Sequence, residues 1–224
     1  MVIVDEQSRI VPLFPLETVL FPYTAIPLHV CDPRYRELVL YCLEHDSPFG
    51  VALIREGQEV GDTEPEIYEV GTLARIGRLR RLSDGRFQLL ATGEERFRIR
   101  HLIRGETPYL QAEIISWHDS ETNWEVLRAC TESLRVQFLE FLRAVLEPMG
   151  VQVNDIRLPE DPVAFSFVLA GTLQAPLPFR QYLLEIQDTL ERLRLIEEVL
   201  QNATPSSEVR PFDPARWQEY VQRN

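Results

Sequence analysis

Short apolar runs broken by prolines dominate the first part of the chain. In residues 11–39, VPLFPLETVLFPYTAIPLHVCDPRYRELV, prolines stand at positions 12, 15, 22, 27 and 33. Proline cannot donate to a sheet ladder, so it marks strand starts, edges and turns. The pattern therefore predicts two short strands, over residues 10–14 and 25–30, joined by an apolar loop.

A helix is predicted directly after the second strand. Asp32 precedes Pro33, which is a favourable pair for an N-cap and a first helical turn. Leu38, Tyr41 and Cys42 then recur at helical spacing. We expect a helix over residues 34–45.

Strand-like segments continue to about residue 118. Asp84-Gly85 between two apolar runs is a strong hairpin signal, and Gly71 and Gly93 are expected at further turns. Residues 96–100 alternate with a period of two, which predicts that Phe97 and Ile99 point inward while Arg96, Arg98 and Arg100 point outward.

The pattern changes to helical spacing after residue 119. Thr122 and Glu125 form a capping box, with Thr122 as the N-cap of a helix that runs to about residue 146. A second helix is predicted over residues 163–173, apolar on most sides and therefore buried, and a third over residues 179–201. Residues 203–211 have the composition of a linker, and a short terminal helix carrying Trp217 and Tyr220 follows.

These elements predict an α+β protein. Residues 1–118 form a mostly antiparallel β domain with one helix, residues 119–202 form a small helical bundle, and residues 203–224 form a linker with a short terminal helix.

The order of these motifs resembles the amino-terminal, substrate-binding domain of Lon proteases. The resemblance is strong over residues 10–118 and weaker to about residue 200. Its opening is carried by Pro12, Leu13, Phe14, Pro15, Leu16, Leu20, Phe21, Pro22, Pro27, Leu28, His29, Pro33, Arg34, Tyr35 and Arg36. Residues 68–74 (YEVGTLA), 84–87 (DGRF), 95–99 (ERFRI) and 108–109 (PY) continue it. The resemblance implies a PUA-like pseudo-barrel that binds protein substrates. Cys31 departs from the family, which usually carries an apolar aromatic residue there.

The chain contains no lysine, since all 23 basic residues are arginine. Lon proteases are driven by ATP and cut peptides with a Ser-Lys dyad. A Walker-type phosphate loop needs a lysine, and a dyad needs a lysine whose pKa can be lowered, which arginine cannot imitate. We therefore expect a stand-alone, non-catalytic form of the family that is independent of ATP and needs no cofactor.

Charge and cysteine usage say little about the fold but bear on the cellular compartment of the protein. The net charge is −12, with −9 over residues 1–74, +6 over residues 75–104 and −9 over residues 105–224. Three cysteines, at positions 31, 42 and 130, have no framework spacing. The first residues carry acids and no long apolar run, so we expect no signal peptide. No run approaches the ~18 apolar residues of a membrane span. We expect a cytoplasmic protein.

The apolar loop is the first candidate binding site, with Leu20, Phe21, Pro22 and Tyr23 as its residues. An apolar loop on a rigid sheet suits the capture of exposed apolar segments. The structural alternative is that Phe21 fills the core beneath the loop; for Tyr23 the two alternatives are balanced.

A basic strip is the second candidate surface. Arg78, Arg80, Arg86, Arg98 and Arg100 lie on neighbouring predicted strands, close to aromatic residues. Arginines interleaved with aromatic residues can bind RNA by phosphate contacts and stacking. The alternative, which we favour, is a solvated strand face whose arginines pair with the acidic segment 56–69.

A metal site is not expected. His29 and Cys31 on a strand and Cys42 and His45 on a helix match no standard zinc spacing. We expect a protein-binding module whose partners are unfolded or degron-bearing polypeptides and a cellular protease, rather than nucleic acid or membrane. The alternative is an RNA-binding protein that uses the arginines of residues 75–104.

Overall fold

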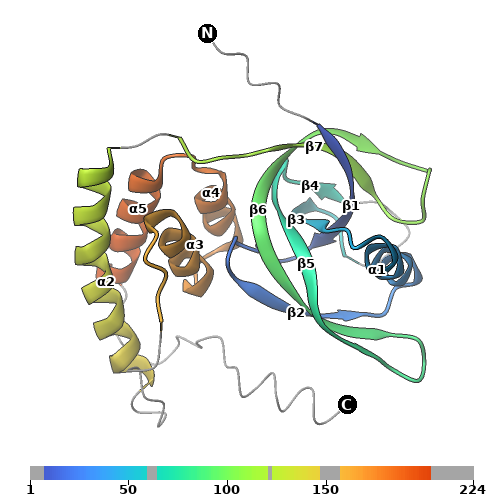
Figure 1. Ribbon diagram of the computed structural model, residues 1–224, viewed down its shortest axis with the longest axis horizontal. Helices are drawn as coiled ribbons and strands as arrows, with labels where there is room; N and C mark the ends of the chain where they lie inside the picture. Colours follow the sequence, from blue (N-terminus) through green and yellow to red (C-terminus); the bar gives the residue numbers. More distant parts are fainter. Residues whose placement is uncertain (1–7, 60–64, 121–122, 147–156, 203–224) are drawn as a thin grey trace. The chain divides into compact units, whose positions relative to one another are not determined.

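The computed structural model describes residues 8–59, 65–120, 123–146 and 157–202 (Figure 1). Contacts divide the described chain into two units. The first contains the residues up to His118 together with Leu177–Glu185, and the second contains Asp119–Pro176 and the residues from Ile186 onward. The linker and terminal helix expected after residue 202 lie outside the described residues, as does Thr122.

The first unit is built on a seven-stranded sheet. Its strands are β1 (Arg9–Leu16), β2 (Ala25–Val30), β3 (Phe49–Glu56), β4 (Glu66–Ile67), β5 (Val70–Arg81), β6 (Phe87–Ile103) and β7 (Gln111–Ser116). Neighbours follow the order β1-β7-β6-β5-β3-β4, and β1 also pairs with β3, so five strands close into a ring. The β1–β3 pairing is parallel and the other pairings are antiparallel.

Strand β1 is longer than predicted and runs through Pro15. Its first half pairs with β7 and its second half with β3. Each half therefore needs a partner on one side only, so the missing N–H groups of Pro12 and Pro15 need not interrupt a ladder. The strand predicted over residues 10–14 is therefore correct in kind but too short at both ends.

Gly71 and Gly93 lie inside strands rather than at the predicted turns. A Cβ atom on Gly71 would come within 2.5 Å of the Phe97 ring, and one on Gly93 within 2.3 Å of the Phe21 carbonyl oxygen. Both glycines are needed because another group approaches the strand closely.

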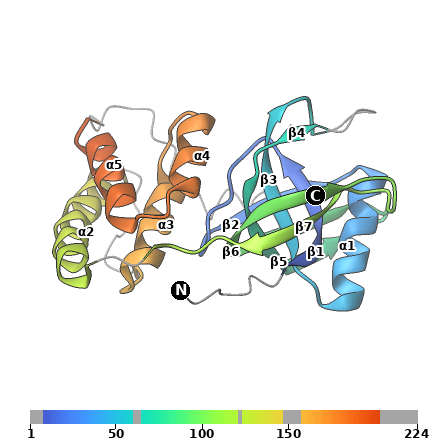
Figure 2. The ribbon, with the colours of Figure 1, turned by 90° about the horizontal axis from the view of Figure 1, so that it is seen from above.

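Helix α1 (Pro33–His45) covers one side of the strands, as Figure 2 shows. Asp32 caps it as predicted, and its carboxylate accepts the backbone N–H of Arg34 at 2.8 Å. The Arg34 side chain also donates to this carboxylate and lowers the pKa of Asp32. The buried face of the helix packs with Phe14, Phe49 and Leu89 in the main core. A second cluster surrounds Phe97 on the other side of the sheet.

The second unit contains the helices α2 (Trp124–Leu146), α3 (Pro162–Thr172) and α5 (Thr189–Asn202). Asn123 performs the capping expected of Thr122, because its side-chain oxygen accepts the backbone N–H of Glu125 at 3.0 Å. Asp161 caps α3, whose residues are buried on most sides, as predicted.

The single helix predicted over residues 179–201 is two helices, α4 (Leu177–Glu185) and α5. Asp188 begins α5, since its carboxylate accepts the N–H of Leu190 at 2.8 Å and of Glu191 at 3.2 Å. An N-cap inside an apolar stripe ends the preceding helix. The break allows α4 to group with the strands of the first unit.

The α+β class and the mostly antiparallel sheet are confirmed. The division into residues 1–118, 119–202 and 203–224 stays a proposal about independently stable parts. Helix α4 lies within residues 119–202 but groups with the residues up to His118, so the boundary needs testing there.

Candidate functional site

The loop between β1 and β2 is mostly buried. Leu20, Phe21 and Pro22 lie inside the first unit, whereas Tyr23 is exposed, with 56% of its surface accessible. Of the four residues predicted to contact a partner, the structure therefore presents one to solvent. Phe21 fills the core beneath the loop, which is the structural alternative considered for it.

The backbone of this loop is fixed by hydrogen bonds to distant strands. The Thr72 hydroxyl donates to the Leu20 carbonyl at 2.6 Å. Tyr23 N–H donates to the Gly93 carbonyl at 2.9 Å, and Gly93 N–H donates to the Thr24 carbonyl at 2.8 Å. Buried, hydrogen-bonded backbone groups resist local opening, so these bonds hold the loop as a rigid support for its tip.

Tyr23 occupies this tip in the left-handed region, with φ of +62°. A bulky residue in this region is uncommon and costs conformational energy. The surrounding hydrogen bonds hold the strained backbone, and the aromatic side chain is directed to solvent.

Helix α4 supports the loop from behind. The Arg180 guanidinium donates to the Val19 carbonyl at 3.3 Å and lies 5.6 Å from the centre of the Phe21 ring. Burial lowers the pKa of Arg180, but an arginine remains charged at neutral pH. Gln181 donates to the Val70 carbonyl at 3.0 Å.

Sequence reasoning did not find this role of α4. The residues that make these contacts are polar positions of a helix that was treated as part of the bundle. The available signal was Asp188-Thr189, which is typical of the start of a helix. A helix that starts there leaves residues 177–185 as a separate helix that need not pack in the bundle.

Arg96 does not point to solvent as the alternation predicted. It is buried in the first unit and donates to the Leu184 carbonyl of α4 at 2.5 Å. Trp117 donates to the Glu185 carbonyl at 3.0 Å. The C-terminal carbonyls of a short helix need external donors, and these two side chains supply them.

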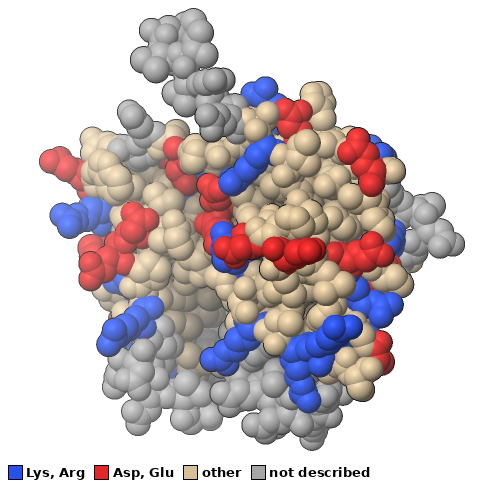
Figure 3. Space-filling model, turned by 45° about the vertical axis from the view of Figure 1, so that its right-hand side comes forward, with Lys and Arg blue, Asp and Glu red and all other residues tan. Residues whose placement is uncertain are grey.

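The other arginines of residues 75–104 are exposed or, in the case of Arg86, half-buried, and several pair with acids. Arg86 contacts Asp84 at 2.6 Å and Arg98 contacts Glu69 at 2.9 Å. Arg75 contacts Glu94 at 2.7 Å. Arg78, Arg80 and Arg100 also reach the surface. The ion pairs of Arg75, Arg86 and Arg98 show that the strip is not a uniformly positive surface. Figure 3 shows one face of the molecule, on which basic and acidic groups lie close together.

The four residues weighed as metal ligands are not brought together as a site. Cys42 is buried in the main core, and burial raises the pKa of its thiol to about 12. Cys31 is exposed, and the His45 ring stacks on Tyr41. Among the described residues, no group of three or more His, Cys, Asp or Glu is placed to hold a metal ion.

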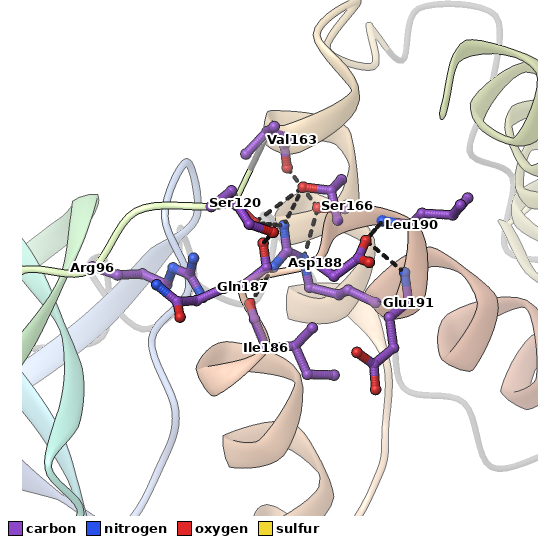
Figure 4. A network of polar contacts seen from close by, with 12 residues as sticks. Arg96, Ser120, Val163, Ser166, Ile186, Gln187, Asp188, Leu190 and Glu191 are labelled. Atoms are coloured by element: carbon purple, nitrogen blue, oxygen red, sulfur yellow. Dashed lines mark hydrogen bonds and ion pairs between the residues drawn. The ribbon is translucent and has the colours of Figure 1, made fainter. Parts of the chain in front are cut away.

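The second unit contains a buried polar network around Arg192. Its guanidinium contacts Asp119 at 2.6 Å, the Ser166 hydroxyl at 2.9 Å and the Ile186 carbonyl at 2.7 Å. Figure 4 shows how Ser166, Ile186 and Asp188 lie in this region. Burial lowers the pKa of Arg192, and Asp119 opposes this effect. The partners of Arg192 come from several segments of one unit, which indicates a structural role.

A hollow of about 750 Å³ also lies in the second unit, lined by residues that include Trp124, Arg128, Glu132 and Glu160. Sequence reasoning did not find it. Within the described part of the chain, the helices are too short or too polar to cross a membrane.

Comparisons with known proteins agree on one family. The model of the ATP-dependent protease La (LON) substrate-binding domain matches residues 10–202. The chain is 28% identical over 203 residues to Lon protease 2 of Myxococcus xanthus, and 26% identical over 201 residues to Lon protease of Anaeromyxobacter dehalogenans. Each match covers 88% of this chain, which spans about a quarter of the length of these relatives.

Solved structures show the same fold. The N-terminal domain of the Mycobacterium avium complex Lon protease superposes with a TM-score of 0.67 at 21% identity, over 88% of this chain and all of that one. A Lon N-terminal domain protein from Xanthomonas campestris superposes with a TM-score of 0.58 at 26% identity, over 85% of this chain and 98% of that one.

Proposed function

The chain belongs to the Lon substrate-binding domain family, and from this premise we propose that it is a non-catalytic module that binds apolar or unfolded polypeptide segments. Tyr23 is the proposed contact residue, and the loop beneath it is its support. A cellular protease is the proposed second partner, for which the module would act as an adaptor or regulator.

The exposure of Tyr23 on a fixed loop carries this proposal. Tyrosine combines a large apolar ring with a hydroxyl group, and it is enriched where proteins bind one another. A side chain held on a rigid backbone loses little conformational entropy when a partner binds. The strain at φ of +62° is also of the kind that clusters at functional positions.

The absence of lysine supports the non-catalytic part of the proposal. Without lysine the chain has neither the phosphate-binding group of a Walker loop nor a Ser-Lys dyad. The purified chain is therefore expected to hydrolyse no ATP and to cleave no casein above the level of a mock purification.

Binding of an unfolded polypeptide tests the proposal directly. The probe is fluorescently labelled, reduced and carboxymethylated α-lactalbumin, titrated with the full chain and followed by anisotropy. Tyr23→Ala is expected to weaken binding by about 1 kcal/mol, or roughly fivefold, and Tyr23→Phe to retain most of it.

A matched control comes from the second unit. Trp124 is an aromatic residue with 62% of its surface exposed, so Trp124→Ala removes a similar apolar area elsewhere. If Trp124→Ala weakens binding and Tyr23→Ala does not, the proposed site is wrong.

A salt series separates this function from RNA binding. Apolar capture tolerates salt, whereas phosphate binding weakens steeply with it. Tighter binding of a single-stranded RNA than of the unfolded protein at low salt, with a steep loss toward high salt, would replace the proposal with the RNA alternative.

The three free cysteines support action in the reducing cytoplasm.

A further inference from the structure

The outer half of β5 has a strand on one side only. Residues 76–81 pair with β6, where Ile76 lies opposite Ala91 and Arg81 opposite Phe87. On its other side β5 pairs with β3, and that ladder ends at Ala74. No described strand pairs with residues 76–81 on this second side. An open edge of this kind offers unpaired backbone groups to which another strand can be added.

Helix α1 runs beside this edge. At one end, a Cβ atom on Gly85 would lie 3.2 Å from the Arg36 guanidinium, and at the other end Arg75 contacts Asp46 at 3.3 Å. Between these contacts, Leu40 and Leu43 follow Arg36 on one face of the helix. Residues four and seven positions apart share a helix face.

Three exposed leucines line this side of the edge. Leu40 is 46% exposed, Leu43 is 47% exposed, and Leu79 of β5 is 36% exposed. Leu79 lies opposite the fully buried Leu89, so it belongs to the face of the sheet that α1 covers. The α1 side of the edge is therefore apolar.

The opposite face of the edge is positively charged. Arg80 lies opposite Gln88, and Gln88 lies opposite His29, so the three form one cross-strand row on the face opposite to that of Leu79. Gln88 is buried within this row, whereas Arg80 and His29 are exposed. The bulge between Ile76 and Leu79 places Arg78 near the same face. Residues 75–87 carry a net charge of +4 in a chain whose net charge is −12.

We propose that the edge of β5 over residues 76–81 binds an extended segment of another polypeptide that alternates apolar and acidic residues, and that this segment adds to the sheet as a strand. Successive side chains of an added strand point to opposite faces. Its apolar residues would contact Leu40, Leu43 and Leu79, and its acidic residues would pair with Arg78 and Arg80.

A polypeptide fits this edge better than a nucleic acid. The open backbone groups are complementary to another main chain, and the row of leucines has no counterpart in phosphate recognition. The net charge of the remaining chain also repels a long polyanion. Strand β6 lies between the edge of β5 and β2, the strand that follows the Tyr23 loop, and the edge proposal does not depend on the function proposed for the loop.

Synthetic peptides test the edge site. The probe is the capped peptide VEVEVEV, with VVEEEVV as a control of equal composition and VKVKVKV as a control of opposite charge. We expect VEVEVEV to bind and both controls to bind at least about tenfold more weakly. Hydrogen exchange should show new protection of the amides of residues 76–81 when VEVEVEV is added.

Two modifications separate strand addition from simple charge attraction. Two N-methylated forms of VEVEVEV are compared, one methylated at the odd-numbered amides and one at the even-numbered amides. In an added strand only one of these two sets donates to β5, so one form is expected not to bind and the other to bind normally. The double variant Arg78→Glu/Arg80→Glu should weaken binding at least about tenfold. The matched variant Arg128→Glu/Arg143→Glu changes the net charge equally on α2 and should bind normally.

Several outcomes would overturn the proposal. One is that VVEEEVV, or both N-methylated forms of VEVEVEV, bind as tightly as VEVEVEV. Another is that amide exchange at residues 76–81 does not change. A third is that a single-stranded RNA binds more tightly than VEVEVEV and depends on the same two arginines. Tyr23→Ala should leave VEVEVEV binding unchanged, so failure at the loop and failure at the edge are distinguishable.

Discussion

The Tyr23 tip of the buried loop and the edge of β5 are two exposed features of one β unit that are held in different ways. The loop backbone is hydrogen-bonded to β5 and β6, far away in sequence, and presents a single aromatic group. The β5 edge belongs to a hairpin in which β5 pairs with β6, the next strand along the chain. This edge presents backbone groups, leucines and arginines.

This difference separates two kinds of recognition. A fixed aromatic tip can contact many apolar sequences, because it requires no particular backbone geometry of its partner. A strand edge requires an extended partner and reads alternate side chains. The two sites would therefore select different features of a client polypeptide.

The largest expected effect is on the second hydrophobic cluster of the β unit, which surrounds Phe97. Phe97 is fully buried, and its ring lies against Gly50 and Gly71. Phe97→Ala should lower the free energy of unfolding by about 3–5 kcal/mol, measured by urea denaturation. Val136→Ala, at an exposed position of α2, should change it by less than about 0.5 kcal/mol.

A loss of less than about 1 kcal/mol for Phe97→Ala would mean that this core can repack. The sheet that carries both the loop and the β5 edge would then be less rigid than the burial of Phe97 implies.

Much of the fold was predictable because local signals agreed with it. The strand over residues 25–30, the Asp32 cap, the hairpin at Asp84-Gly85 and the buried α3 all follow from turn chemistry and periodicity. The errors arose where tertiary contacts decide. The burial of Arg96 depends on Leu184, and the strand position of Gly93 depends on the close approach of Phe21.

The candidate site was less predictable for the same reason. An apolar run such as LFP has the same composition whether it faces solvent or fills a core, so burial could not be assigned to its residues individually. The β5 edge brings together α1 and β5, and their proximity depends on the closure of the barrel. Pairwise patterns along the sequence contain no such information.

The next largest effect should separate the two regions. A methyl group on Gly93 would meet the Phe21 carbonyl oxygen at 2.3 Å. Gly93→Ala should therefore cost about 1–3 kcal/mol of stability and displace the loop, so binding of the unfolded polypeptide falls while VEVEVEV binding persists. At Gly77 an added Cβ atom would lie 3.2 Å from the Leu90 carbonyl oxygen. Gly77→Ala should therefore lower stability by less than Gly93→Ala does. Equal loss of both ligands in Gly93→Ala would show that the regions are coupled.

A smaller effect should isolate the strain at Tyr23. Glycine adopts a positive φ without the steric cost that alanine meets there. Tyr23→Gly should therefore be more stable than Tyr23→Ala by about 1 kcal/mol, measured as a difference in thermal unfolding, while both variants bind the unfolded polypeptide weakly. If Tyr23→Gly has no stability advantage, the backbone relaxes in solution and the loop is less rigid than its hydrogen bonds indicate.

The smallest effect is expected from the arginines that lie outside both regions. Arg98 donates to Glu69 at 3.1 and 2.9 Å through Nε and Nη2, and both side chains are exposed. An exposed pair contributes only about 0.2–1 kcal/mol and is screened by salt. Arg98→Ser/Arg100→Ser should therefore change stability by at most about 1 kcal/mol, with a smaller difference at high salt.

The same double variant should bind the unfolded polypeptide and VEVEVEV within about twofold of the parent chain, because neither arginine is placed at Tyr23 or on residues 76–81. Titrations at low and high salt measure this. A tenfold loss of either ligand at low salt that disappears at high salt would mean that residues 75–104 act as one electrostatic surface. The distinction between a fixed aromatic tip and a selective strand edge would then no longer describe how this unit recognises its partners.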